Sequence, residues 1–188
     1  ILSTSLYSDG TGTSGKEVGG LQLIVADAGS GTVGGINSST YTFWQNAQTT
    51  ATSSAFSTTN VQADMNTIYL SLVRGSDSPD LIMADTNSYK SFLGSLQAIQ
   101  RVTSDRVATS GFTSVQYLNS DVIFDDACPT NKMYFLNTDY LRLEVAANRN
   151  FVPGEAKMSV NQDAMVTPMF WSGNLTVSNR ALQGVIHV

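Results

Sequence analysis

A helix, a strand and a second helix follow one another in the first half of the chain, and this order limits the fold more than any other feature. The first helix is predicted over residues 60–74, because apolar residues recur there at spacings of four, three and four. Thr59 and Gln62 predict a capping box at its start, and Gly75 stops it. The apolar face consists of Val61, Met65, Ile68 and Leu72.

The strand and the second helix follow directly. The apolar run over residues 80–85, after Pro79, predicts a buried strand. A helix cap at Asp85 or Thr86 then begins a helix that runs to about Gln100. Its inner side is formed by Tyr89, Phe92, Leu93, Leu96 and Ile99. Helix, strand and helix in this order indicate an α/β lobe.

The second half of the chain is rich in strand signals. Residues 164–177 form one long strand signal, but Pro168 cannot donate to a ladder and Gly173 invites a bulge, so this strand is bent or lies at an edge. A last strand is predicted over residues 182–188. Four earlier runs, separated by turn residues, predict a meander or a pair of hairpins: 114–119, 121–126, 132–137 and 140–145.

The first part of the chain carries weaker signals. Leu2 and Leu6 fall on one face of a helix, and Tyr41, Phe43 and Trp44 form an aromatic anchor. We expect, in order, the end of a helix over residues 1–8, a glycine-rich connection over 9–20, a short buried helix or strand over 21–27, a loop over 27–40 and a long surface loop over 46–59.

A glycine cluster at residues 29–34 follows an apolar run, as a dinucleotide-binding loop follows its first strand. That mechanism needs a helix after the third glycine and an acidic residue about 20 positions later. Turn and β-branched residues follow instead, and no acidic residue occurs between Asp27 and Asp64. The second cluster, at residues 10–15, follows a predicted helix, and the chain has no Gly-Lys-Ser or Gly-Lys-Thr. We therefore expect connections between packed elements and no cofactor.

The residue types give little support for nucleophilic catalysis or for metal binding. The only histidine, His187, lies in an apolar strand, where it is more often a bystander than a base. The only cysteine, Cys128, rules out a disulfide within the chain and fits a small, partly buried side chain. One cysteine and one histidine cannot build a common structural zinc site. We assign no catalytic, cofactor-binding or metal-binding residue.

Two groups of carboxylates flank predicted strands. Aspartates favour turns and helix caps at such positions, and this is the interpretation we prefer. The central glycine and terminal glutamate of an EF-hand loop are missing. The two groups are Asp77, Asp80 and Asp85, and Asp121, Asp125 and Asp126. The alternative is a carboxylate-dependent glycoside hydrolase or a carbohydrate-binding β-rich module, which would use the second group with tyrosine and tryptophan platforms such as Trp44 and Trp171.

The composition argues for a surface that meets other proteins. Of the 188 residues, 41% are hydrophobic and only 13% are charged, about half of the usual charged share. Short uncharged polar side chains replace the charges, and they cost little to order or desolvate beside another protein. The net charge of -5 argues against a protein that grips a phosphate backbone. No apolar stretch approaches the length of a membrane span.

The order of segments resembles the major capsid proteins of tailed bacteriophages and prophages, which have the HK97-type fold. The resemblance covers nearly the whole chain. It is carried by residues 7–25, 31–37, 79–85, 132–145 and, above all, 161–186.

The resemblance implies an α+β fold with an axial domain, built from a central sheet and flanking helices, and part of a peripheral domain. Residues 1–19 would form the end of a spine helix and a connection in the peripheral domain, 20–147 the axial domain, 148–178 peripheral-domain strands, and 179–188 a final strand that rejoins the axial sheet. The N-terminal arm and the extended loop of the family would be lacking before Ile1.

The function implied by the resemblance is structural. The chain would not be an enzyme and would assemble into pentamers and hexamers of an icosahedral shell that encloses DNA. Its partners would be copies of itself in capsomers and other virion proteins, without sequence-specific nucleic-acid binding and without a membrane. It would reside in the virion capsid, and in the cytoplasm of the bacterial host before assembly. We also expect residues 101–111 near a ring axis.

Overall fold

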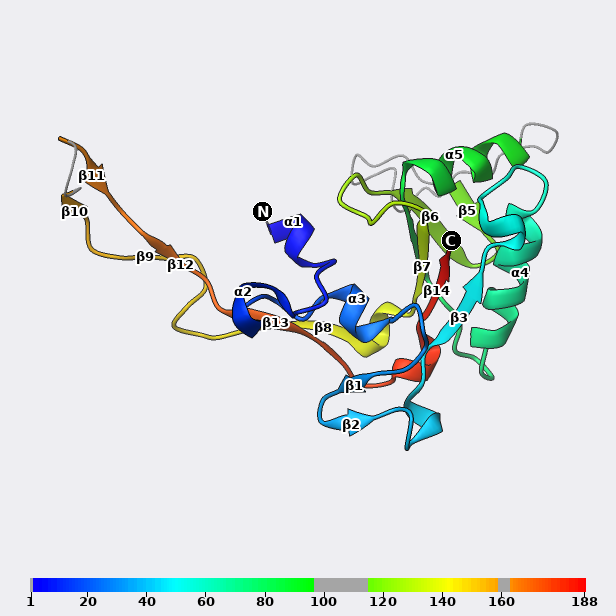
Figure 1. Cartoon of the computed structure of the whole chain (residues 1–188), viewed down its shortest axis with the longest axis horizontal. Coiled ribbons are helices and arrows are strands. Elements are labelled where there is room, and N and C mark those ends of the chain that lie inside the picture. Colours follow the sequence, from blue (N-terminus) through cyan, green and yellow to red (C-terminus); the bar gives the residue numbers. More distant parts are fainter. Residues whose placement is uncertain (1, 97–114, 159–162) are drawn as a thin grey trace.

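A six-stranded mixed sheet forms the centre of the fold (Figure 1). The structure is a computed structural model, and it describes residues 2–96, 115–158 and 163–188. β14 is parallel to β3 and antiparallel to β7, while β4 is antiparallel to β7 and parallel to β6. β5 completes the sheet as the antiparallel neighbour of β6. In spatial order the strands are β3 (Ala47–Thr50), β14 (Gly184–His187), β7 (Lys132–Leu136), β4 (Leu81–Ala84), β6 (Ser120–Phe124) and β5 (Val115–Tyr117).

Two helices cover one face of this sheet. α4 (Val61–Leu72) and α5 (Thr86–Ser95) pack together there, and their buried side chains form one hydrophobic core with side chains from the sheet. Successive residues of β7 divide between the two faces, as the pleat requires. Met133 and Phe135 point into this core, whereas Tyr134 and Leu136 point into the core on the other face.

The second core lies under the N-terminal segment. α3 (Leu21–Ile24) buries Leu21 and Ile24, and Tyr7 packs beside Tyr134 with ring centroids 6.0 Å apart. Two short elements precede α3, namely α1 (Leu2–Ser5) and α2 (Gly12–Gly15). The sheet is therefore covered on both faces, as expected of a sheet whose central strands are apolar on both sides.

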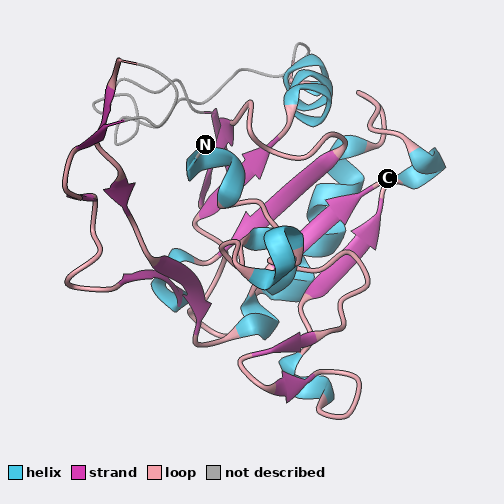
Figure 2. Cartoon of the chain, turned by 60° about the vertical axis from the view of Figure 1, so that its left-hand side comes forward, coloured by secondary structure: helices cyan, strands magenta, loops and turns pink. Residues whose placement is uncertain are grey.

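A long two-stranded ribbon leaves the sheet, and we call residues 141–158 and 163–177 the ribbon. Figure 1 shows it extending away from the six strands, and Figure 2 shows it beside the sheet from another side. Three antiparallel pairs follow one another along it: β8 (Leu141–Val145) with β13 (Gly173–Val177), β9 (Val152–Pro153) with β12 (Met169–Phe170), and β10 (Lys157–Met158) with β11 (Met165–Val166).

Several predicted elements are confirmed. The helix predicted over residues 60–74 is α4, the strand predicted over 80–85 contains β4, and Asp85 is the N-cap of the second helix. α5 ends at Ser95, and the predicted continuation to Gln100 falls outside the described residues, as do residues 101–111. The strand signal over 164–177 is broken into β11, β12 and β13, and one break contains Pro168, as expected.

Other local predictions are wrong. The capping box of Thr59 and Gln62 does not form, because α4 begins at Val61 with Asn60 as an N-cap that makes no side-chain capping bond. The surface loop predicted over 46–59 contains β3, an edge strand of the sheet. β3 could not be predicted because it lacks an apolar pattern. Its sequence is Ala-Gln-Thr-Thr, and its side chains are half-buried or exposed.

The predicted meander or pair of hairpins is confirmed only in its first hairpin. Only β5 and β6 form a hairpin among the four runs, with Tyr117 opposite Ser120. β7 pairs with β4 and β14, and β8 pairs with β13 in the ribbon. The meander fails because β4, from earlier in the chain, lies between β6 and β7. The sequence indicates these strands, but it does not indicate which strands pair with one another.

Candidate functional site

The first glycine cluster forms a tight hairpin. β1 (Thr32–Val33) pairs with β2 (Ile36–Asn37), and the two residues between them, Gly34 and Gly35, have φ values of 61° and 79°. Positive φ at both central residues defines a type I′ turn, for which Gly-Gly is a favoured sequence. The apolar run before it is α3, not a strand. This order differs from the strand, loop and helix that hold a dinucleotide phosphate.

The glycine-rich connection over residues 9–20 brings the N-terminal segment close to α3. The Gly20 N–H donates to the Ser8 carbonyl at 2.9 Å, and the Leu21 N–H donates to the Leu6 carbonyl at 2.7 Å. A Cβ on Gly20 would overlap the Leu6 carbonyl oxygen. The Gly19 N–H donates to Asn174 Oδ1 at 2.7 Å, so the same connection also holds the ribbon. These glycines allow close backbone approach.

The aspartates at the ends of β4 cap and fasten turns. The Asp85 carboxylate accepts bonds from the Asn87, Ser88 and Asn131 N–H groups, at 3.2, 3.0 and 3.0 Å. Asp80 accepts from the Thr138 N–H at 2.8 Å and from the Thr138 hydroxyl. Both carboxylates therefore have the backbone partners that turn and cap positions provide.

The aspartates around β6 lie at the two ends of the strand. Asp121 is in β6 and Asp125 directly follows it, so their Cα atoms are about 13 Å apart. Asp125 accepts a bond from the Tyr7 hydroxyl at 2.6 Å and from the Ala127 N–H at 2.9 Å. Asp121 is buried at the start of β6, and Asp126 is exposed. This geometry gives the hydrolase alternative no support.

Cys128, Lys132 and His187 have structural contacts. The Cys128 thiol is buried, and burial raises its pKa to about 12, so it stays protonated well above neutral pH. The Lys132 ammonium lies 2.6 Å from the Asp27 carboxylate. His187 Nε2 lies 3.3 Å from Gln48 Oε1 on the neighbouring edge strand. The described residues contain no group of three His, Cys, Asp or Glu side chains that could hold a metal ion.

The aromatic side chains considered as sugar platforms lie in different parts of the molecule. Trp44 donates from Nε1 to the Val33 carbonyl at 3.1 Å, and Trp171 contacts Phe151 in the ribbon with ring centroids 6.3 Å apart. Tyr41 and Phe43 are 53% and 69% exposed, so only Trp44 of the predicted aromatic anchor is partly buried. This part of the anchor prediction is wrong, because Tyr41 and Phe43 contact each other, with ring centroids 6.0 Å apart, and both remain exposed.

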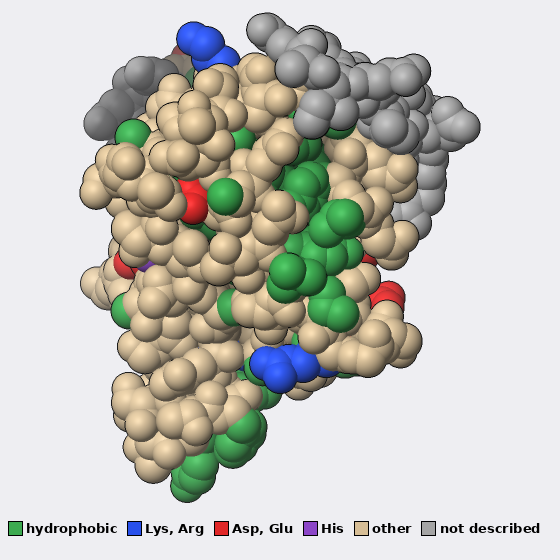
Figure 3. Space-filling model, turned by 90° about the vertical axis from the view of Figure 1, so that its right-hand side faces the viewer, with side chains coloured by type: hydrophobic (Ala, Val, Ile, Leu, Met, Phe, Trp, Pro, Cys, Tyr) green, Lys and Arg blue, Asp and Glu red, His purple; other side chains and the backbone are tan. Residues whose placement is uncertain are grey.

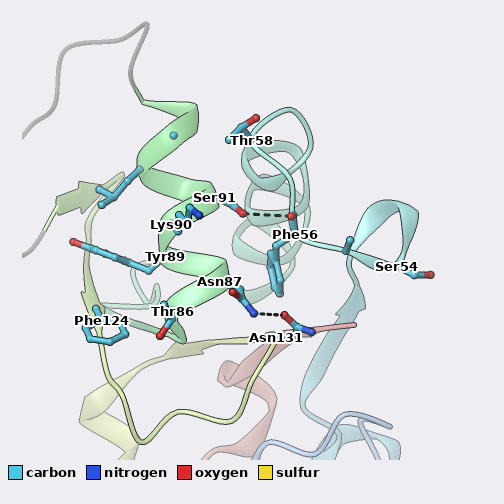
Figure 4. Close-up of a pocket in the computed structure, with 13 residues that line it drawn as sticks. Ser54, Phe56, Thr58, Thr86, Asn87, Tyr89, Lys90, Ser91, Phe124 and Asn131 are labelled. Carbon is cyan, nitrogen blue, oxygen red and sulfur yellow. Dashed lines mark hydrogen bonds between the residues drawn. The ribbon is translucent and has the colours of Figure 1, made fainter.

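A groove of about 990 Å³ lies between α5 and the residues before α4 (Figure 4). Two hydrogen bonds fasten its walls: Asn87 Nδ2 donates to Asn131 Oδ1 at 3.1 Å, and the Ser91 hydroxyl donates to the Phe56 carbonyl at 3.3 Å. Among the described residues that line it, Lys90 is the one charged side chain, and none is Asp, Glu, His or Cys. The groove therefore lacks the carboxylate or imidazole that general acid–base catalysis normally uses.

A buried arginine, which no pattern in the sequence indicates, organises the hairpin region. The side chain of Arg180 is fully buried and donates to Ile24 O at 2.5 Å, to Asn46 Oδ1 at 2.9 Å and to Ser38 Oγ at 3.2 Å. Longer bonds reach the carbonyl oxygens of Ser30, Gly31 and Trp44. Burial lowers the pKa of Arg180. No local pattern in the sequence marks an arginine as buried, so no signal could have found it.

Exposed apolar side chains gather on the ribbon. Two-stranded ribbons are marginally stable in water by themselves, and exposed apolar clusters mark interaction surfaces. Arg149 lies over the Phe170 ring, 5.0 Å from its centroid. The exposed apolar residues of the ribbon beyond β8 are Phe151, Val152, Met158, Met165, Val166, Met169 and Phe170, with exposed fractions from 40% to 73%. The ribbon is therefore the candidate interaction surface among the described residues.

Comparison with solved structures identifies the fold. A chain of the cyanophage A-1(L) capsid asymmetric unit is similar over 98% of this chain, with a TM-score of 0.72 and 17% sequence identity. A chain of the holo-SrpI encapsulin complex from Synechococcus elongatus PCC 7942 is similar over 74% of this chain, with a TM-score of 0.54 and 13% identity. The sequence matches no protein-family model and no curated protein.

These likenesses define the class by its fold. The chain has an α+β fold of the HK97-like capsid type, as the resemblance in the sequence predicted. It spans 63% of the length of the cyanophage chain and 52% of the encapsulin chain. None of the helices among the described residues is long and apolar enough to cross a bilayer.

Proposed function

We propose that this chain is a structural subunit of a protein shell and that it assembles with copies of itself. The observation that carries the proposal is the part of the ribbon beyond β8, which exposes seven large apolar side chains while belonging to a fold found in capsid and encapsulin subunits. The outer part of the ribbon is held by two pairs of two-residue strands, and it gains stability when another surface covers its apolar side chains. Neighbouring subunits of a shell provide such a surface many times over.

The finer form of the proposal is a major capsid protein of a tailed phage or prophage. Subunits would form pentamers and hexamers through head-to-tail contacts, and these would close an icosahedral shell around DNA. The net charge of -5 supports this role, because an acidic wall does not adsorb packed DNA irreversibly. The protein would reside in the virion, and in the bacterial cytoplasm before assembly. Other virion proteins would be further partners.

The domain assignment belongs to the same proposal. The six-stranded sheet with α4 and α5 would be the axial domain, and the ribbon would lie in the peripheral domain with the end of the spine helix at residues 1–8. β8 pairs with β13 and would therefore belong to the peripheral domain, although residues 141–145 lie before the expected boundary at 147. β14 rejoins the main sheet between β3 and β7.

Negative-stain electron microscopy of the intact gene product tests this function. The wild-type protein should form closed particles or ring-shaped capsomers. Met165→Glu, which places a charge on a side chain that is 72% exposed in the ribbon, should abolish or greatly reduce them. Thr32→Glu adds the same charge at an exposed position of β1 and should leave assembly intact. A wild-type protein that stays monomeric at all concentrations would refute the proposal.

A further inference from the structure

The outward face of α4 is unusually free of charge. The only charged residue of the helix, Asp64, is buried and accepts bonds from the Thr52 N–H and hydroxyl at 3.0 and 2.6 Å. The exposed residues of the helix are Ala63, Asn66, Thr67, Leu70 and Ser71. Figure 3 views the molecule from the side on which α4 lies, and hydrophobic side chains form a band on this face, with few charged side chains around it.

Two leucines on this side of the molecule are strongly exposed. Leu70 in α4 is 70% exposed, and Leu118 in the turn between β5 and β6 is 60% exposed. Tyr117 fastens this turn to the helix, because its hydroxyl donates to Asn66 Oδ1 at 2.6 Å and its ring lies edge-on to Tyr69 at 6.0 Å. Asn66 and Leu70 are one helical turn apart and share a face. Val73 directly follows α4 and is 36% exposed. We call Asn66, Leu70, Val73 and Leu118 the α4 patch.

The backbone of Leu118 gives an independent reason to assign a function to this patch. Leu118 has a φ of 52°, at the first position of a two-residue hairpin turn. Glycine, asparagine or aspartate is favoured there, because a leucine Cβ makes positive φ costly. The chain therefore holds a leucine in a strained conformation and directs its side chain into water. The two-residue turn needs a positive φ, which glycine would supply at lower cost, and the leucine side chain is largely exposed. A strained position of this kind supports a hypothesis of function.

The charges of the chain decide which partner fits the patch. Copies of a protein with a net charge of -5 repel one another, so they meet at the lowest cost where carboxylates are missing. The exposed residues of α4 and both turn residues, Leu118 and Asn119, carry no charge. Arg74, which follows α4, is exposed and cationic, and it would attract an acidic copy. A strongly charged partner would find no complementary group on the patch itself.

We propose that the α4 patch is a contact surface for a second copy of this chain, with Leu70 and Leu118 as its apolar anchors. This inference rests on the proposed shell function and adds to it a specific contact at the opposite end of the molecule from the ribbon (Figure 1). A subunit with apolar contact surfaces at both ends can meet different neighbours at each end. Closed assemblies of many copies need such repeated contacts.

Leu118→Gly in the intact gene product tests the patch. Glycine tolerates the positive φ, so the dissociated subunit should melt at the same temperature as wild type or higher, while the anchor is lost. The protein concentration required for half-maximal assembly, measured by light scattering and sedimentation velocity, should rise about tenfold or more. Ser53→Gly is the matched control, because Ser53 has a φ of 67° and is exposed but polar. It should leave assembly unchanged.

Leu70→Glu provides the second arm. It should block assembly while leaving the melting temperature of the dissociated subunit within about 2 °C of wild type, since surface substitutions have small effects on stability. Normal assembly of both leucine variants would overturn the inference while the proposed function stands. A marked fall in the melting temperature of dissociated Leu70→Glu would also overturn it, because the patch would then be packed within its own chain. If wild type does not self-associate, the proposed function fails and the inference fails with it.

Discussion

Gln183 and Asn137 exchange two hydrogen bonds in the interior of the protein. The Asn137 N–H donates to Gln183 Oε1 at 3.0 Å, and Gln183 Nε2 donates back to the Asn137 carbonyl at 3.1 Å. Gln183 is fully buried and Asn137 is 4% exposed. The side-chain amide thus continues the ladder between β14 and β7 past the end of the strands, and it satisfies a backbone donor and acceptor that would otherwise be buried unpaired.

Replacing Gln183 with glutamate should make stability depend on pH. At pH 7 the carboxylate can accept from the Asn137 N–H but cannot donate to its carbonyl, so we expect a loss of about 3 kcal/mol in the free energy of unfolding. Burial raises the pKa of such a carboxyl above its unfolded value of about 4.3, and the protonated form can donate. The deficit relative to wild type should therefore shrink as the pH falls through that raised pKa.

Urea denaturation of wild type and Gln183→Glu at several pH values between 4 and 8 measures this effect. Gln48→Glu, on the edge strand β3, is the control, because Gln48 is exposed and the change should alter stability by less than about 0.5 kcal/mol. A deficit for Gln183→Glu that is constant over this pH range would show that the lost donation to Asn137 is not its cause.

Arg180→Met should be strongly destabilising. Methionine fills much of the space but leaves the Ile24 carbonyl and Asn46 Oδ1 without their donor, at a cost of about 3 kcal/mol. The loss should appear as a lower urea midpoint and as faster hydrogen exchange of the backbone around Ser38 and Asn46. Arg142→Met, at an exposed position of the ribbon, removes the same charge and should change subunit stability little. Equal stability of the two variants would contradict the structural role of Arg180.

Gly20→Ala should detach the N-terminal segment from α3. The added methyl group would overlap the Leu6 carbonyl oxygen, so the bond between that oxygen and the Leu21 N–H cannot persist in its present geometry. We expect a loss of about 2 kcal/mol, a size typical of a steric conflict in a packed region. Hydrogen–deuterium exchange with mass spectrometry should show faster exchange over residues 6–21 than in wild type. Unchanged exchange there would contradict the predicted overlap.

Cys128 should make the protein sensitive to alkaline pH. Burial raises the pKa of its thiol from 9.0 to about 12, so the folded protein retains the proton more tightly than the unfolded chain. The resulting stability is complete below pH 9 and is lost as the pH rises towards 12. Between these values the free energy of unfolding of wild type should fall more steeply than that of Cys128→Ala, by up to about 1.4 kcal/mol per pH unit.

Urea denaturation at pH 8, 9, 10 and 11 compares the two slopes. Cys128→Ala also loses some packing, but this offset is the same at each pH and leaves the slope unaffected. A residual slope should remain in the variant, because burial also raises the pKa of Tyr117, to about 12, and those of Tyr7 and Tyr134. Identical slopes for the two proteins would show that the Cys128 thiol titrates normally.

The parts of the fold that could be predicted are those with a strong local period. α4 has apolar side chains on one face, and β4 is an apolar run between Pro79 and a capping aspartate, so both elements were visible without any knowledge of their partners. The strand β3 could not be recognised, because it is polar and its partner β14 lies 137 positions later, where Ala47 faces Gly184. Local patterns carry no information about such distant pairing.

The proposed function was likewise only partly predictable from the sequence. The capsid-like fold was predicted from the order of segments, and the aspartates at strand ends have the turn and cap contacts that their positions favour. The α4 patch could not be recognised from the sequence. Leu70 lies among the apolar residues of a helix whose other large apolar side chains are buried, so the sequence does not show that Leu70 is exposed. Nothing in the sequence indicates the positive φ of Leu118. Both features depend on which neighbours the fold brings together.

The position of β14 between β3 and β7 has a consequence for biosynthesis. The gap it fills stays open until Gly184–His187 have left the ribosome, although β3 was made 137 residues earlier. At typical translation rates of about 5–20 residues per second, this delay is on the order of ten seconds. During that time Val185 and Ile186 are missing from the two cores, so a prematurely terminated chain would remain open to chaperones and proteases. Truncated products would be removed before they could be built into an assembly.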